Sequence, residues 1–335
     1  MSWVIAVLPP TSSLRASEPS WEIVNGHLVA KLDVLAGFQA DGQLRVPGLA
    51  DNATLWLDIG VNGLPTPYPG QGQSFRSLLE RHAFYIGFEP LLDKYALGIA
   101  RGVQAVKRVP LGTVELRDAT RSSAIMVPLA VADLDNRMAK FHVSSVDGCS
   151  SLHSQRSREE LQKGGWTKSR TASFVQAGCA GDRDAVEMRM VPTVTLKVVL
   201  QDWLGGREVE FMHIDVQGAE LSVLRSARDR LQQVHRILLE VPAPSCATLT
   251  EGAPSCSEVF DALRTLGFEP EDGIPAKNTK GIGLLRGFSC TDVPWETWNS
   301  QCEFDVLFVR RDIRNRFEDV VQRYDKYRAP VAGRD

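Results

Sequence analysis

A mainly parallel, doubly wound α/β sheet is the fold class that the sequence predicts, on two observations. Apolar segments of strand length alternate with helical patterns through most of the 335 residues, as they do where helices connect parallel strands. The first of these segments, residues 55–59, breaks directly into a loop that contains Gly60, Asn62 and Gly63. A buried strand that feeds a tight loop marks the edge where open α/β sheets bind their ligands.

The remaining elements follow from the same patterns, taken along the chain. A second strand, residues 84–88, ends at Glu89, and three prolines and two glycines between residues 64 and 72 delay the first helix to residues 74–80. The later strands are predicted at residues 123–132, 141–146, 186–191, 209–214, 236–239 and 304–309. The later helices are predicted at residues 91–100, 196–204, 220–231, 257–266 and 310–328.

Acidic residues near the ends of the first two strands indicate a cofactor site. A side chain at Gly60 would keep the backbone away from a ligand, and Asn62 tolerates left-handed φ and ψ angles. Asp58 would repel a phosphate, which favours a cofactor with an amine over one with a pyrophosphate. Glu89 is placed like the acid that accepts hydrogen bonds from ribose hydroxyls in nucleotide-binding halves. Either motif alone is also ordinary turn chemistry, but the pair in this order predicts a nucleoside cofactor with an amino group.

Composition and charge narrow the classes of partner. The 38 basic and 41 acidic residues give a net charge of -3, so no overall field attracts nucleic acid or an anionic membrane, and we expect neither. The chain is 43% apolar and 24% charged, as in an ordinary soluble globular protein, and the apolar run at residues 1–8 is too short to span a membrane. The six cysteines lack the spacing of a zinc site, and their low density predicts reduced thiols and a cytoplasmic protein.

One domain is expected to hold most of the chain. Residues 1–50 would form an N-terminal extension, residues 51–310 the domain, and residues 311–335 a C-terminal helix and tail. The stretch 153–184 is polar and rich in Arg, Lys, Ser and Gly, so we interpret it as an insertion that is either a lid over the site or a solvated surface loop. The terminal helix would dock on the domain or contact a second copy, and the oligomeric state stays open.

A set of short motifs, in this order, resembles a known family. They are Asp-Ile-Gly-Val-Asn-Gly at 58–63, Gly-Phe-Glu-Pro at 87–90, Leu-Ala-Val-Ala-Asp at 129–133, Gly-Cys-Ser-Ser-Leu at 148–152, Val-Pro-Thr-Val-Thr-Leu at 191–196, His-Ile-Asp-Val-Gln-Gly-Ala-Glu at 213–220 and Leu-Leu-Glu-Val at 238–241. Together they resemble the FkbM family of S-adenosylmethionine-dependent methyltransferases, from about residue 55 to residue 309. The resemblance implies a class I methyltransferase (Rossmann-like) sheet with an antiparallel last strand, and methyl transfer to a hydroxyl oxygen of a small molecule or a sugar.

The resemblance also implies a role for each matching residue. Asp58, Gly60 and Asn62 would line the methionine part of the cofactor, Glu89 would bind the ribose hydroxyls, Ala132 and Asp133 would lie beside the adenine, and Asp215 would lie near the reactive methyl. Two positions depart from the family pattern. Leu64 stands where the family has the last glycine of the loop, which leaves open a weakened or lost cofactor site. His213 replaces a common lysine, and we interpret it as a hydrogen-bonded histidine of the core.

Asp215 is the candidate catalytic residue, and its role has two interpretations. Methyl transfer from a sulfonium needs an acceptor oxygen that is held in line and gives up its proton, and a carboxylate at the end of a central strand can take that proton. The same carboxylate could instead cap the following helix through the amides of Gly218 and Ala219. Glu220, in the first turn of this helix, fits a structural role. Asp215 and Glu240 without a third ligand are weak evidence for a metal ion, and we expect none.

We therefore predict an S-adenosylmethionine-dependent O-methyltransferase. A rival from another class is a non-catalytic protein that keeps the fold as a binding or scaffold module, which the changed loop at Leu64 supports. A nicotinamide-dependent dehydrogenase agrees less well with the sequence, because no G-x-G-x-x-G opens the first helix and Asp58 would face a pyrophosphate.

Overall fold

The structure is a computed structural model that describes a large part of the chain. The described residues are 21–24, 27–30, 54–62, 83–96, 113–114, 124–146, 148–166, 179–180, 186–270, 290 and 302–313. The helices predicted at residues 74–80 and 310–328 lie mostly or wholly outside these ranges, as does the proline-rich loop after Asn62. The described part of the N-terminal extension is a strand pair, β1 (Trp21–Val24) and β2 (His27–Ala30).

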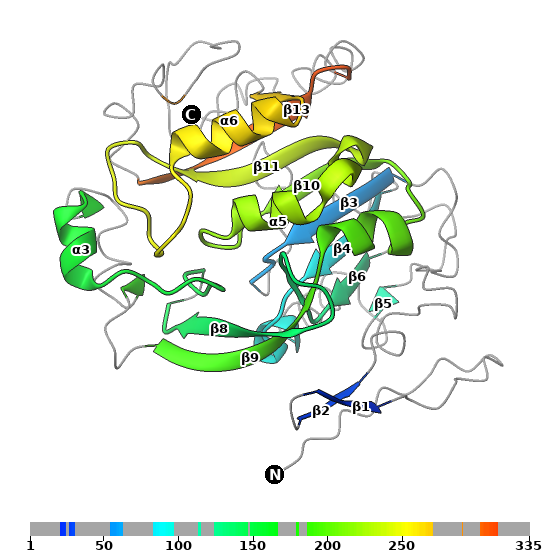
Figure 1. Ribbon diagram of the computed structural model, residues 1–335, viewed down its shortest axis with the longest axis horizontal. Helices are drawn as coiled ribbons and strands as arrows, with labels where there is room; N and C mark the ends of the chain where they lie inside the picture. The colour runs from blue at the N-terminus through cyan, green and yellow to red at the C-terminus, as the bar shows by residue number, and fades with distance from the viewer. Residues whose placement is uncertain are drawn as a thin grey trace, which may run out of the picture.

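An eight-stranded sheet forms the centre of the domain (Figure 1). In spatial order its strands are β12 (Phe268–Pro270), β13 (Glu303–Arg310), β11 (Val234–Pro242), β10 (Val209–Ile214), β3 (Thr54–Ile59), β4 (Ala83–Phe88), β6 (Ala124–Val127) and β5 (Thr113–Val114). The strands β11, β10, β3, β4 and β6 are parallel to their neighbours in this series, whereas β13 is antiparallel to β11 and β12. A mixed α/β fold with a mostly parallel sheet and an antiparallel last strand is therefore confirmed.

The central strands are nearly continuous in apolar residues because both faces of a parallel sheet are covered. In β3 every residue after Thr54 is buried, and in β10 only Glu210 is partly exposed. The register places Leu57 beside Met212, and the next pair along is Asp58 and His213. Two charged side chains thus lie side by side near the carboxyl ends of otherwise apolar strands.

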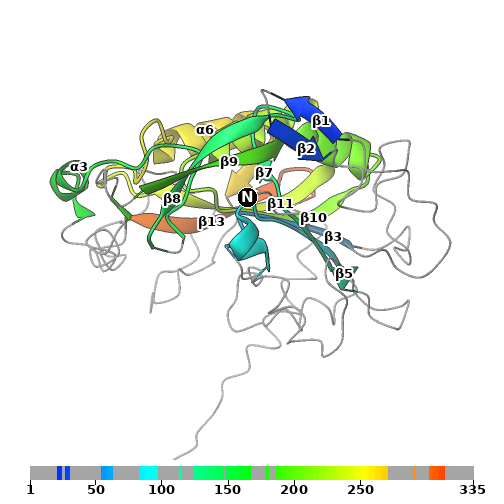
Figure 2. The same cartoon turned by 90° about the horizontal axis from the view of Figure 1, so that it is seen from below.

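The chain forms two short strands where the sequence predicts one strand over residues 123–132. The strand β6 ends at Val127, and the following Pro128 has no N–H with which to continue the ladder. The chain then enters a separate three-stranded sheet (Figures 1 and 2), whose strands are β7 (Ala130–Val131), β9 (Val186–Val194) and β8 (Met138–Ser144). A proline at a strand end therefore moves the chain from one sheet to another.

Helices follow several of the strands, and two of them lie on one face of the central sheet in Figure 1, α5 and α6. The described helices are α3 (Arg158–Lys163), α5 (Glu220–Ser226), α6 (Cys256–Thr265), the π-helix η4 (Val198–Trp203) and the 3-10 helix η5 (Arg228–Gln233). The helix α3 lies in the predicted insertion. A capping box between Ser157 and Glu160 starts it, and Leu161 is fully buried, so this part of the insertion packs on the domain.

All six cysteines are paired in disulfides, so the expectation of reduced thiols is wrong. The pairs are Cys149–Cys179, Cys246–Cys302 and Cys256–Cys290, with Cα–Cα distances of 5.3, 5.5 and 6.0 Å. These distances lie within the usual range for disulfides. The partners are 30, 56 and 34 residues apart in the chain, so the fold alone brings them together and no local spacing reveals the pairing.

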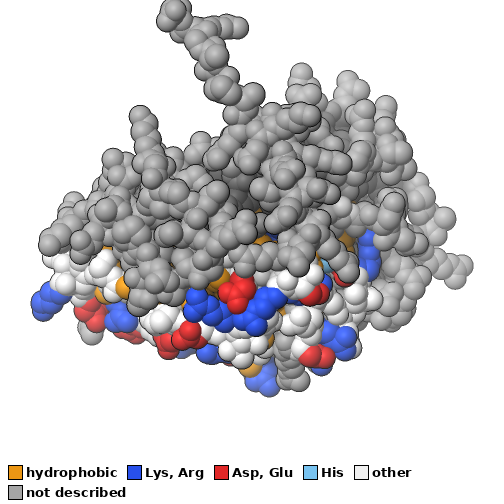
Figure 3. Space-filling model, turned by 90° about the horizontal axis from the view of Figure 1, so that it is seen from above, with side chains coloured by type: hydrophobic (Ala, Val, Ile, Leu, Met, Phe, Trp, Pro, Cys, Tyr) orange, Lys and Arg blue, Asp and Glu red, His pale blue; other side chains and the backbone are white. Residues whose placement is uncertain are grey.

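Two further features concern the described helices and surface. No helix among the described residues has both the length and the apolar character needed to cross a membrane. On the face shown in Figure 3, acidic and basic side chains of the described residues are interspersed.

Candidate functional site

The carboxyl ends of β3, β4 and β10 meet at one open cavity with a volume of about 600 Å³. Its position is the edge at which open α/β sheets bind their ligands. Val131 of β7 and Phe141 of β8 contribute to its lining, so the three-stranded sheet supplies part of the wall. The polar side of the cavity includes Asn62, Glu89, Ser150, Asp215 and Gln217.

Gly60 allows two strand ends to approach each other closely. Its φ angle is 93°, and a Cβ atom built on it would lie 1.8 Å from the carbonyl oxygen of Asp215. Both facts exclude a side chain at this position. The Gly60 N–H donates to the Phe88 carbonyl at 3.0 Å, and the Asp215 N–H donates to the Ile59 carbonyl at 2.9 Å. The loops after β3, β4 and β10 are therefore fixed relative to one another.

Glu89 is a buried carboxylate at the cavity. It is 4% exposed, and its Oε2 accepts a hydrogen bond from the Asn62 N–H at 2.7 Å while Oε1 accepts one from the Leu91 N–H at 2.9 Å. Burial raises the pKa of Glu89 to about 7, although the two backbone hydrogen bonds act in the opposite direction. Each carboxylate oxygen has a further lone pair, so Glu89 can also accept hydrogen bonds from a ligand in the cavity.

The Asp58 carboxylate is bonded inside the sheet. Its Oδ2 accepts a hydrogen bond from the Tyr85 hydroxyl at 2.5 Å, and its Oδ1 lies 2.8 Å from Nδ1 of His213. Burial opposes a positive charge on His213, but the hydrogen bond and the charge of Asp58 prevail and raise the pKa of His213 to about 9. His213 is therefore protonated at neutral pH and forms a buried ion pair with Asp58, which agrees with its interpretation as a hydrogen-bonded core residue. Asp58 does not line the cavity.

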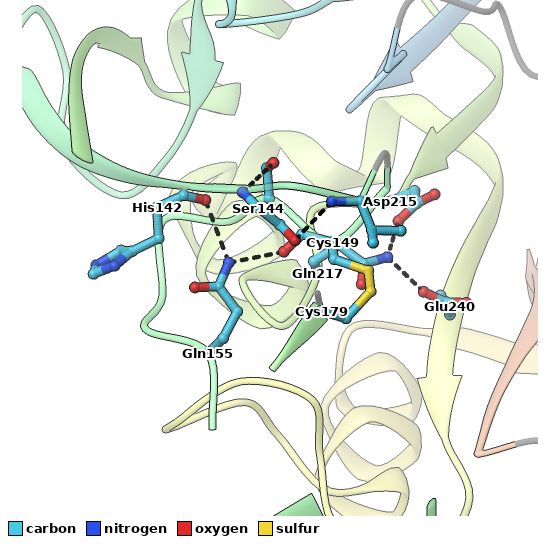
Figure 4. Close-up of a disulfide and its surroundings, with 10 residues drawn as sticks. His142, Ser144, Cys149, Gln155, Cys179, Asp215, Gln217 and Glu240 are labelled. Atoms are coloured by element: carbon cyan, nitrogen blue, oxygen red, sulfur yellow. Dashed lines mark hydrogen bonds between the residues drawn. A yellow bond between two sulfur atoms is a disulfide. The ribbon is translucent and has the colours of Figure 1, made fainter. Parts of the chain in front are cut away.

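The Asp215 carboxylate lies at the cavity, bonded to a glutamine two positions later. Nε2 of Gln217 donates to Oδ1 of Asp215 at 2.7 Å and to Oε2 of Glu240 at 2.8 Å (Figure 4). Burial raises the pKa of Asp215, while the charge of His213 and the hydrogen bond from Gln217 act to lower it. An acid with a raised pKa can take a proton more readily near neutral pH than an exposed one.

A second, smaller cavity of about 280 Å³ lies next to the first and is lined by Glu220, Glu240 and Glu303. Burial raises the pKa of Glu220 to about 7 and that of Glu303 to about 8; burial and the charge of Glu303 raise the pKa of Glu240 well above its usual range. The Glu220 carboxylate accepts a hydrogen bond from the Gly218 N–H at 2.9 Å. The partner of this amide is therefore Glu220 and not Asp215. Among the described residues, no group of three or more His, Cys, Asp or Glu side chains is arranged to hold a metal ion.

Four of the predicted site residues lie together at the first cavity: Gly60, Asn62, Glu89 and Asp215. Ala132 and Asp133 directly follow Val131, which lines the cavity, but neither of them lines it themselves. Ala132 is buried and Asp133 is exposed. A cofactor role for Asp58, Ala132 and Asp133 stays a prediction.

Gln217 and the apolar wall of the cavity are not evident from the sequence. Gln217 adopts a φ angle of 54°, which is uncommon for glutamine, and its only sequence signal is the glycine that follows it. Phe141 and Leu152 reach the cavity from the three-stranded sheet and the loop after it, and strand pairing between β7, β9 and β8 is what brings them there. Such pairing between distant segments has no local sequence pattern.

Comparison with family models gives a match over more than half of the chain. Residues 72–270 match the model described as the methyltransferase FkbM domain. The matched stretch begins after β3 and its glycine loop and ends with β12, so it is shorter than the span of residues 55–309 over which the motifs resemble that family. Comparisons with curated proteins and with solved structures give no match.

Proposed function

The chain belongs to the FkbM family of methyltransferases, and from this premise we propose that it transfers a methyl group from S-adenosylmethionine to a hydroxyl oxygen of a small molecule or a sugar. The observation that carries the proposal is the meeting of Glu89 and Asp215 at one cavity. Glu89 can accept hydrogen bonds from the ribose of a nucleoside, and Asp215 can take a proton from an acceptor hydroxyl. Both lie at the ligand-binding edge of a mostly parallel sheet.

We assign the sheet to the class I methyltransferase fold on the basis of its strand order. The series β6, β4, β3, β10 and β11 is parallel, and the series ends with an antiparallel β13 next to β12. The antiparallel last strand is the feature that the family resemblance implies. The strand β5, which is antiparallel to β6, adds an eighth strand at the far edge.

The residues at the carboxyl ends of β3 and β4 fit the cofactor. Gly60 lines the cavity with backbone alone, which lets the main chain approach a ligand, and Asn62 follows it with a left-handed φ angle of 49°. Glu89 keeps a lone pair on each carboxylate oxygen for the ribose hydroxyls. The cofactor, when bound, supplies an electrophilic methyl group on a sulfonium.

Asp215 is assigned to the acceptor. Its carboxylate lines the same cavity as Glu89 from the end of β10, with β3 between β10 and β4, and accepts a hydrogen bond from Gln217. We assign it the proton of the acceptor hydroxyl, which it would take as that oxygen bonds to the methyl carbon and the methyl–sulfur bond breaks, so that the donor would leave as a neutral thioether. A base and an oriented acceptor are the two contributions that such a displacement needs from the protein.

Calorimetric titration of the purified protein with S-adenosylmethionine tests the first half of the proposal. We expect saturable binding, and no binding at millimolar ligand would favour a non-catalytic scaffold instead. Transfer of a labelled methyl group onto a cell extract, with identification of the labelled product, then defines the acceptor. Asp215→Asn should lower turnover at least about tenfold while changing cofactor affinity much less, and equal loss of both would contradict the assignment of Asp215 to the acceptor.

A further inference from the structure

Gln217 occupies a costly position in the turn after β10. Its φ angle of 54° lies in the left-handed region, which a glutamine adopts only at a cost in free energy, and its side chain is 9% exposed. The turn is fixed on both sides: the Thr250 hydroxyl donates to the Gln217 carbonyl at 3.1 Å, and the Ser151 hydroxyl donates to the Val216 carbonyl at 3.2 Å. This backbone directs the side chain back over the end of the strand.

One amide group then serves two carboxylates. The two hydrogens of Nε2 are given to Asp215 at 2.7 Å and to Glu240 at 2.8 Å, from β10 and β11 respectively (Figure 4). Gln217 also lines both cavities, so it lies between the two groups of acids. A donor shared between two acids lets both accept a hydrogen bond without sharing a proton.

We propose that Gln217 is a positioning residue for methyl transfer: its amide holds the Asp215 carboxylate in place at the first cavity. The proposal rests on the role of Asp215 given above. It explains why a strained backbone is retained at a position that glycine would adopt freely. Glycine there would provide the turn but not the donor.

The surroundings of Asp215 show why a donor is needed. Most of the charged groups that face it are acids, and His213 is the cation among them. The groups are Asp58 on β3, His213 on β10, Glu220 on α5, Glu240 on β11, and Glu303 and Asp305 on β13. Burial and the charges of Asp305 and Asp58 raise the pKa of Asp215, and the positive charge of His213 and the Gln217 hydrogen bond oppose them. Without the amide, the positive charge of His213 remains to oppose the rise in the pKa of Asp215.

The test compares Gln217→Gly with a matched control, Asn136→Gly. Both changes remove an amide side chain from a left-handed position, since Asn136 has a φ angle of 50°, but Asn136 is exposed and lies outside both cavities. For Gln217→Gly we expect kcat at neutral pH to fall about tenfold, KM for the cofactor to change less than about threefold, and the acidic limb of the pH profile to move up by about one unit. The control should leave all three unchanged.

A second measurement does not depend on activity. Titration of the Asp215 carboxyl carbon by NMR in the cofactor-free protein should give a higher midpoint in Gln217→Gly than in the wild type, and Asp215→Asn identifies the signal. Gln217→Asn, which keeps an amide too short to reach both acids, replaces the glycine variant if that variant does not fold. Equal midpoints, or a wild-type pH profile, would overturn the proposal. If the wild type binds no cofactor but the midpoint moves, the proposed function fails and the contact between Gln217 and Asp215 still stands.

A separate observation, the pairing of all six cysteines, supports a second inference. The disulfide Cys149–Cys179 joins the insertion to the loop that lines the cavity, because Cys149 lies between Gly148 and Ser150 (Figure 4). The Gln155 amide donates to the Cys149 carbonyl at 2.9 Å and holds the same loop. Cysteines of two disulfides, Cys149–Cys179 and Cys246–Cys302, belong to one buried cluster with Leu161, Trp166 and Leu249. The disulfides are thus part of the packing beside the site.

We infer that the protein matures in an oxidising compartment. Disulfides form and persist in secretory, periplasmic and extracellular environments, and the reducing cytosol disfavours them. Three disulfides that use every cysteine of a 335-residue chain are therefore typical of a protein outside the cytosol. This inference differs from the cytoplasmic location expected from the sequence, which depended on reduced thiols.

Peptide mapping of the protein from the cells that naturally make it provides the test. The cells are quenched in acid and alkylated before any reduction, so that free thiols are marked and disulfides are not. We expect three cross-linked peptide pairs, Cys149 with Cys179, Cys246 with Cys302 and Cys256 with Cys290, and six alkylated cysteines only after reduction. Alkylation of these cysteines without reduction would overturn the inference, whether or not the protein binds S-adenosylmethionine.

Discussion

Asp58 shows how a single residue can fit a motif and still make different contacts from those the motif implies. Its position after an apolar strand and before a glycine loop predicts a cofactor ligand. In the structure both of its carboxylate oxygens are engaged, one with Tyr85 and one with His213, on the two strands that flank β3. His213, which departs from the family pattern, is thus the partner of Asp58, which matches that pattern.

Asp58→Asn should therefore reduce stability more than cofactor binding. Loss of one partner of a buried ion pair leaves a buried charge without compensation, which costs about 3–5 kcal/mol. The folded pKa of His213, about 9, lies above its unfolded value, so the contribution of the pair is complete below about pH 6.5 and is lost as the pH rises through about 9. Urea unfolding at several pH values measures this effect. The difference in unfolding free energy between wild type and variant should shrink towards pH 10, and a constant difference would contradict the ion pair.

Glu89 should make cofactor affinity depend on pH. Its pKa is raised to about 7 by burial, and hydrogen bonds from ribose hydroxyls favour the ionised form, so binding should release a proton at and below pH 7. We expect affinity for S-adenosylmethionine to increase between about pH 6 and pH 8, measured by calorimetry in buffers of different ionisation enthalpy. Glu89→Gln, which does not titrate, should weaken binding several-fold and remove the dependence. A wild-type affinity that is flat over this range would argue against Glu89 as the ribose ligand.

At the scale of elements, the loops after β3, β4 and β10 form one unit because glycine allows backbone to pack on backbone. Gly60 touches the Asp215 carbonyl, and its N–H is bonded to Phe88 at the end of β4. The site is therefore assembled by main-chain contacts, and the side chains of Glu89 and Asp215 are placed by them.

Gly60→Ala should disrupt this unit, and Gly267→Ala is its matched control. Both glycines have φ angles near 90°, but a Cβ on Gly267 would have its nearest neighbour at 3.7 Å, whereas one on Gly60 would lie 1.8 Å from a carbonyl oxygen. Gly267→Ala should lower the free energy of unfolding by about 1–2 kcal/mol, the cost of a left-handed backbone. Gly60→Ala adds a clash of about 1–3 kcal/mol and should abolish cofactor binding. Thermal unfolding and calorimetry measure the two effects. Equal losses in both variants would mean that the loops do not depend on this contact.

Most of the described strands and helices can be compared with the bounds that the sequence predicts. Periodicity places most described strands within a few residues of their observed bounds, because a buried strand needs a continuous apolar run. It misplaces residues 123–132, since an apolar run does not reveal that Pro128 separates two sheets. It also misses α3, whose signal is the capping box at Ser157 and Glu160 and not an apolar stripe.

At the scale of the whole molecule, the sequence predicts which residues end the strands, but not which side chains share a cavity. Glu89 and Asp215 can be placed at one edge because the ends of parallel strands lie together. The disulfides, Gln217 and the wall from β8 depend on contacts between segments far apart in the chain, and no local pattern encodes them.

The concentration of buried acids gives the whole molecule an unusual pH dependence. Burial raises the pKa of Glu89 and Glu220 to about 7 and that of Glu303 to about 8. The folded protein therefore binds more protons than the unfolded chain between about pH 4.5 and pH 8, so its stability should fall as the pH rises through this range. Urea unfolding of the cofactor-free protein at pH 5 and pH 8 measures the fall. Glu303→Gln should flatten its upper part, and stability that rises with pH would contradict these shifts.

Pro128 has one more consequence, for the way in which this fold can change. Because the chain leaves the main ladder there, β7 and β8 belong to a different sheet from β3 and β4, the strands that precede Gly60 and Glu89. Substitutions along that wall can therefore change the apolar lining of the cavity while the ladder of the main sheet stays intact. A lineage with this architecture can thus vary one side of the cavity through the three-stranded sheet alone.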